Sequence, residues 1–62
     1  MRYEQDFIGA VKVRQAEISA SLVAGHPATY EAYQRLVGQY AGLEEALQLL
    51  LSMIRQDETR EL

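Results

Sequence analysis

The sequence predicts an all-α protein, an antiparallel two-helix hairpin that assembles with further helices into an oligomeric helical bundle. One strong helix-breaking signal, the Gly-His-Pro run at 25–27, divides the chain. Apolar residues recur at helical spacing on both sides of it. The chain has 62 residues and no cysteine, which is little material for an independently stable core. We expect a single domain with helices over about 3–24 and 29–56, a turn over 25–28 and a charged tail over 57–62.

The first predicted helix contains no proline and one glycine, and alanine and long side chains dominate it. Such a composition favours helix over strand. Arg14 and Gln15 interrupt its apolar stripe near the edges, and the opposite side, with Val13 and Val23, is mildly apolar. At 100° per residue the stripe covers an arc of about 100°, and its members are Phe7, Ile8, Val11, Ile18 and Leu22.

The turn is predicted from the chemistry of its residues. Gly25 suits the position just past a helix C-terminus, where the backbone turns left-handed. Thr29 is a candidate N-cap, with Glu31 in the first turn where a carboxylate stabilises the positive end of the helix dipole. An alternative start places Pro27 at the first helical position.

The second predicted helix has the stronger apolar stripe. A short turn makes the two helices antiparallel neighbours, so this stripe is expected to face the first helix. The members again share an arc of about 100°, and they are Ala32, Tyr33, Leu36, Tyr40, Leu43, Leu47, Leu50, Leu51 and Ile54.

The two predicted helices differ in length. At about 1.5 Å per residue they span roughly 33 Å and 42 Å. With Ala24 opposite Ala28, Tyr3 lies opposite Leu49. The residues beyond this point are expected to have no cover from their own chain, and they are Leu50, Leu51, Met53 and Ile54. Burial of such side chains contributes about 1.5 to 3 kcal/mol each, which drives association with a partner.

Three small residues lie four apart in the second helix, Gly38, Gly42 and Ala46, flanked on the same side by Leu49 and Met53. Each glycine inside a helix costs about 1 kcal/mol relative to alanine, so the pair needs an explanation. Small residues at this spacing allow another helix to approach closely. The alternatives are a bend in the helix and no role at all.

The chain is rich in tyrosine, with four in all. For Tyr33 and Tyr40 we favour core packing over recognition, whereas for Tyr30, near the turn, the two roles are equally supported. The predicted interface comprises Gly38, Gly42, Ala46, Leu49, Leu50, Leu51, Met53, Ile54 and Tyr30.

No residue pattern indicates an enzyme, a cofactor site or a metal site. The one histidine, His26, has no nucleophile or acid beside it, and Glu44 with Glu45 is best explained as a solvated face. There is no P-loop, dinucleotide fingerprint or nucleophile elbow. We therefore expect no catalytic, cofactor-binding or metal-binding residues and no small-molecule substrate.

Charge argues against nucleic acid and membranes as partners. The net charge is -3, and the six basic residues are scattered along the chain instead of forming a stripe. No apolar run approaches the about 20 residues of a membrane span, and no targeting signal is present. A protein made in the cytosol that binds itself and another protein is expected.

The second helix carries the pattern Y-x-x-L-V-G-x-x-x-G-L-x-x-A-L from Tyr33 to Leu47. This pattern resembles one in short helical-hairpin proteins encoded among the structural genes of tailed bacteriophages. The resemblance implies an oligomeric minor virion or head-assembly component, located in the virion, with no catalytic residues. The leading hypothesis is a structural or assembly protein, and the alternative is a small regulatory adaptor or inhibitor that binds a helix of one partner protein.

Overall fold

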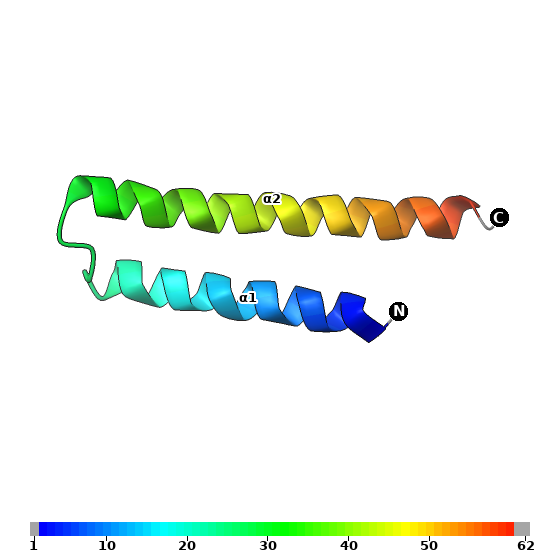
Figure 1. The fold of residues 1–62 in the computed structure, drawn as a ribbon, viewed down its shortest axis with the longest axis horizontal. Coiled ribbons are helices and arrows are strands. Elements are labelled where there is room, and N and C mark those ends of the chain that lie inside the picture. The colour runs from blue at the N-terminus through cyan, green and yellow to red at the C-terminus, as the bar shows by residue number, and fades with distance from the viewer. Residues whose placement is uncertain (1, 61–62) are drawn as a thin grey trace.

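The computed structural model describes residues 2–60, and within this range the chain forms two α-helices and no strand (Figure 1). Helix α1 spans Arg2–Val23 and helix α2 spans Tyr30–Arg60. The helices run antiparallel and side by side, and α2 extends past the start of α1 at the end opposite the turn, hereafter the open end. The predicted two-helix hairpin is confirmed.

The turn is closed by the predicted residues. Gly25 has φ 74°, and the amide of His26 donates to the carbonyl of Ser21 at 3.1 Å while that of Gly25 donates to Leu22 at 3.2 Å. This bond pair is the Schellman motif, which satisfies carbonyls at a helix C-terminus. At the start of α2 the hydroxyl of Thr29 accepts from the Ala32 amide at 3.1 Å, so the threonine cap is confirmed over the start at proline.

Helix α2 is longer than predicted. The expected end near Gln56 is wrong, because the helix continues to Arg60. The charged residues of this segment are mostly good helix formers, and no glycine or proline interrupts them. Of the predicted charged tail, residues 61–62 lie outside the described range.

The hairpin has a thin core. Among the described residues the buried apolar side chains are Val11, Ile18 and Leu47, and Ile18 is only 1% exposed. The molecule measures 51 × 18 × 13 Å, so it is one helix thick. Protein domains usually bury their apolar faces between two packed layers. A single layer leaves one broad face of each helix without a neighbour from its own chain.

A polar contact also joins the helices. Gln15 is buried at 7% exposure, and its amide nitrogen donates to the Glu44 carboxylate at 3.1 Å and to the carbonyl of Tyr40 at 3.4 Å. A second glutamine, Gln48, donates to the other Glu44 oxygen at 3.0 Å. Because the buried amide is paired, Gln15 fits within the apolar stripe of α1.

Candidate interaction surface

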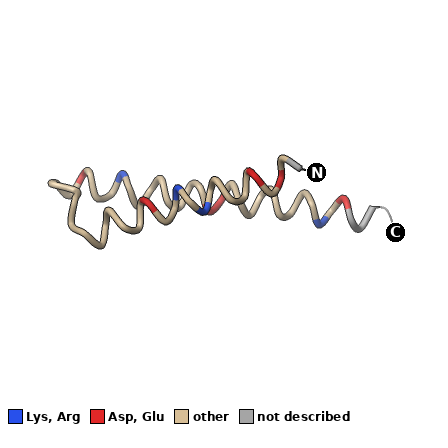
Figure 2. Tube along the Cα trace, turned by 90° about the horizontal axis from the view of Figure 1, so that it is seen from below, with Lys and Arg blue, Asp and Glu red and all other residues tan. Residues whose placement is uncertain are grey.

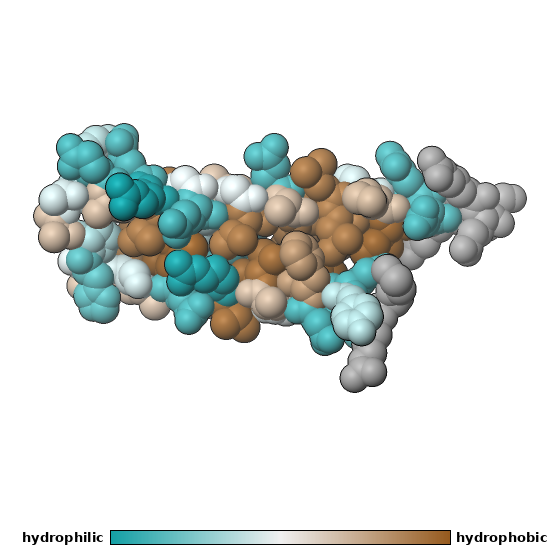
Figure 3. Space-filling view, viewed as in Figure 1, coloured by the Kyte–Doolittle hydropathy of each residue, from teal (hydrophilic) through white to brown (hydrophobic). Residues whose placement is uncertain are grey.

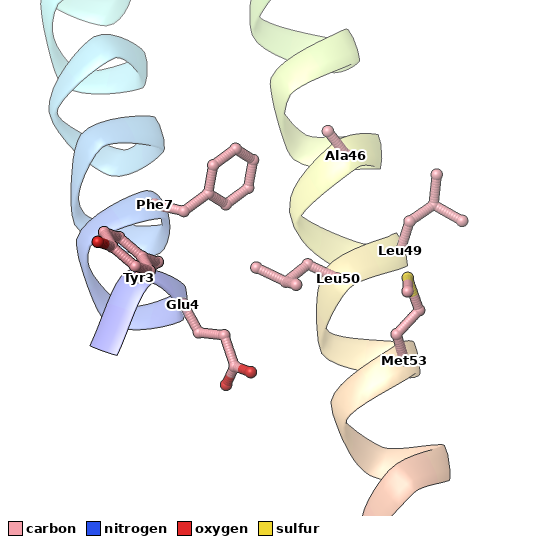
Figure 4. Close-up of a pocket in the computed structure, with 7 residues that line it drawn as sticks. All are labelled: Tyr3, Glu4, Phe7, Ala46, Leu49, Leu50 and Met53. Atoms are coloured by element: carbon pink, nitrogen blue, oxygen red, sulfur yellow. The ribbon is translucent and has the colours of Figure 1, made fainter. Parts of the chain in front are cut away.

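A shallow groove of about 360 Å³ lies between the helices at the open end (Figure 4). We call it the open-end groove. In Figure 4, Phe7 of α1 and Leu50 of α2 point toward one another across it, and Leu49 and Met53 lie beside each other on α2. Its lining residues recur at helical spacing on each helix, and they are Tyr3, Glu4, Phe7, Ala46, Leu49, Leu50 and Met53.

The lining of the open-end groove is apolar and open to solvent. The exposed fractions are 76% for Tyr3, 45% for Phe7, 62% for Leu49 and 64% for Met53. On the face seen in Figure 3, apolar side chains gather along the junction of the two helices, with hydrophilic ones around the outer edges. Several large apolar side chains exposed together, rimmed by polar ones, make this groove a candidate interaction surface.

Nearer the turn, a second and more polar hollow is lined by Arg14, Gln39, Gly42 and Leu43. Arg14 lies two turns after Phe7 on α1, so both hollows lie on the same side of the hairpin. The surface on this side is therefore apolar at the open end and polar toward the turn.

The two glycines of the predicted interface contact nothing in the hairpin. A Cβ atom placed on Gly38 or Gly42 would meet no other atom within 4 Å. Helix α2 is continuous through both positions, so they mark no break in it (Figure 1). A side chain at either position would therefore meet open space in the hairpin.

The expectation that the end of α2 lacks all cover is wrong for Leu50, which lies in the groove with Tyr3 and Phe7. Leu51 and Ile54 are also half-buried. Helical side chains lean toward the helix N-terminus, and the N-terminus of α1 lies at the open end. Tyr3 and Phe7 therefore reach further along α2 than a comparison of backbone positions indicates.

The tyrosines near the turn are more exposed than expected. Tyr33 is 47% exposed and Tyr40 is 38% exposed, so the preference for core packing at these positions is not confirmed. Tyr30, at 69% exposure, stacks on Tyr33 with ring centroids 6.3 Å apart, and Gln34 donates to its hydroxyl at 3.0 Å. Tyr30 lies at the opposite end of the hairpin from Leu49 and Met53, so the predicted interface divides into two separate regions.

The contact between Gln15 and Glu44 escaped the sequence analysis, which placed Glu44 on a solvated face. The hydrogen bond from Gln15, then that from Gln48 and the charge of Lys12, lower the pKa of the Glu44 carboxyl below its ordinary value. A signal was present, because Gln15 follows Val11 by four positions and precedes Ile18 by three, on the buried face.

The described part of the chain holds no group of three or more His, Cys, Asp or Glu side chains that could bind a metal. His26 is exposed in the turn. Neither described helix is long and apolar enough to cross a membrane.

Comparison with protein-family models, curated proteins and solved structures finds no match. The geometry of the hairpin must therefore support any statement about function. It offers an apolar groove at the open end, a glycine-containing side without contacts and a stacked tyrosine pair near the turn.

Proposed function

We propose that this chain is a non-enzymatic structural or assembly protein that works through helix–helix contacts with other proteins. The observation that carries this proposal is the surface area of the hairpin. The chain exposes 5189 Å², whereas a compact monomer of its mass would expose about 4,000 Å². The difference of roughly 1,200 Å² exceeds the about 800 Å² that one partner contributes to a standard protein interface.

The distribution of charge supports a protein as the partner. In Figure 2 basic and acidic residues are both spread along the two helices, with uncharged stretches between them. Nucleic-acid binding would be favoured by basic residues gathered on one face. An apolar groove with few charges instead suits the apolar face of another helix.

We also propose that the chain is a minor virion component, because its second helix resembles a pattern in phage-encoded hairpin proteins. The glycines of that pattern, Gly38 and Gly42, lie on a side of α2 that has open space around it. In a minor virion component this side would lie against a neighbouring subunit. The chain would be made in the cytosol and then join the particle.

Sedimentation and thermal melting over about two decades of concentration test the proposal. A hairpin that needs other helices should associate, and its melting temperature should rise with concentration, because association stabilises the folded form by mass action. A dilute sample that stays monomeric, melts sharply and shows no concentration dependence would contradict the proposal.

A regulatory adaptor or inhibitor is the second candidate function. The exposed, stacked pair of Tyr30 and Tyr33 favours it, since tyrosine is enriched among residues that dominate binding energy. An adaptor should melt without cooperativity when alone and gain a cooperative transition when a partner protein is added. Replacement of Tyr30 with Ala should then abolish that gain.

A further inference from the structure

We infer that the open-end groove is the seat of a second copy of this chain, so that two hairpins pair open end to open end. This inference rests on the proposed function and names the partner at one surface. It concerns the lining residues of the groove and leaves the stacked tyrosines near the turn in solvent.

The first argument is thickness and area. The hairpin is 13 Å thick, one helix layer. A second hairpin on the same side adds a layer at an interaxial distance of about 8–10 Å, so that the overlapping open ends form a four-helix bundle. The exposed area above that of a compact monomer, roughly 1,200 Å², is enough for a standard interface of about 800 Å² per copy.

The second argument is the shape of the lining. Large side chains, Phe7, Leu49 and Met53, lie in the same groove as the small Ala46. In a two-fold symmetric contact each copy presents the same surface to the other. The large side chains of one copy then pack against Ala46 of the other copy, as knobs into a hole.

The third argument is charge, which selects the alignment. If two hairpins overlapped along their whole length in opposite directions, Leu49 and Met53 of one copy would cover the polar hollow around Arg14 of the other. Arg14 pairs with Glu17 at 3.9 Å, and covering this exposed ion pair with apolar side chains removes both charges from water, which is costly. Overlap of the open ends leaves this ion pair in solvent, and Glu4 is the one charged side chain among the lining residues of the groove. The net charge of -3 on each copy offers no long-range attraction that would favour another arrangement.

A double variant with Leu49→Gln and Met53→Gln tests the contact. Both side chains are more than half exposed in the hairpin, at 62% and 64%, so helicity at high concentration should change little. The dimer should dissociate at least about tenfold more readily, as expected when central apolar residues of an interface are lost. Matched controls are Val13→Gln and Val37→Gln, which replace exposed valines outside the groove and should leave the dissociation constant unchanged.

Single-cysteine variants test the same contact without weakening it, because the chain contains no cysteine. Cysteine is introduced in turn at Ala46, Leu49 and Met53, and at Val13 as a control. Near a two-fold axis a residue of one copy faces the same residue of the other copy. A disulfide between them requires Cα atoms within about 7 Å. Mild oxidation should give a disulfide-linked dimer for at least one groove position and none for the Val13 variant.

The possible outcomes separate this inference from the proposed function. If the double variant dimerises as the wild type does, or if only the Val13 variant cross-links, the inference is wrong while assembly through helices stands. If the wild type is a poorly cooperative monomer until another protein is added, the second copy is not the occupant and the result favours the adaptor, the second candidate function. A wild type that stays monomeric and melts sharply without concentration dependence overturns both the inference and the proposed function. Loss of the dimer in the double variant alone, together with a groove cross-link, supports the inference.

Discussion

Replacing glycine with alanine at matched positions measures whether anything packs against the glycine side of α2. Gly9 in α1 and Gly42 in α2 are both interior helix positions, and at both a Cβ atom would meet nothing within 4 Å. In an isolated hairpin the two substitutions should therefore have equal effects, set by helix propensity alone.

The expected magnitude follows from that open space. Alanine at an exposed helix interior gains about 1 kcal/mol over glycine. For a domain of this size about 1 kcal/mol raises the melting temperature by about 4–8 °C. Gly9→Ala should show this full gain, because the position lies outside the predicted interface.

If another helix lies close to Gly42 in the assembled protein, Gly42→Ala should raise the melting temperature less than Gly9→Ala does, or should lower it. Gly42→Leu should disrupt assembly more strongly, since a larger side chain holds the partner away. Thermal melts followed by far-ultraviolet circular dichroism, with sedimentation of each variant, provide the comparison. Equal gains at Gly9 and Gly42, with the oligomer retained in Gly42→Leu, would refute close packing at the glycine side.

Further substitutions address the hairpin itself. Ile18→Ala removes the most buried side chain and should cost about 2–5 kcal/mol in urea unfolding, so a loss below 1 kcal/mol would contradict the described core. Thr29→Ala removes the cap of α2 and should lower the free energy of unfolding by about 1 kcal/mol, whereas an unchanged value would mean that the cap contributes nothing. The fold lowers the pKa of Glu44 from its ordinary value of 4.5, chiefly through the hydrogen bond from Gln15. The carboxylate therefore stabilises the hairpin above that ordinary value, and this contribution is lost as pH falls through the lowered pKa. Glu44→Gln should flatten the acid side of the profile of unfolding free energy against pH more than the neighbouring Glu45→Gln does, and identical profiles would exclude this role.

Local chemistry made the hairpin predictable. Gly25 and Thr29 act within a few residues of their own positions, so their roles in the turn could be assigned without knowledge of the fold. The apolar stripes likewise predicted which faces meet, and Val11, Ile18 and Leu47 are buried in that contact.

The remaining features depend on how two helices fit together. Gln15 was assigned as an interruption because a polar side chain in an apolar stripe has no visible partner until α2 is placed beside it. Leu50 was assigned to an uncovered end because residue spacing omits the lean of side chains such as Tyr3 along the helix axis. The tyrosine exposures were underestimated because a single layer covers only part of each stripe.

The single-layer architecture also has a kinetic consequence. Contacts between the helices can form in order from the turn outward. Each new contact then forms beside one already made, so that only a short loop has to be closed. Separation of the two helices begins at the end farthest from the turn, which carries Tyr3 and Phe7. A second copy bound there would stabilise the helix contacts that open first. Amide hydrogen exchange in the first turns of α1 would then slow on dimerisation far more than exchange beside Gly25.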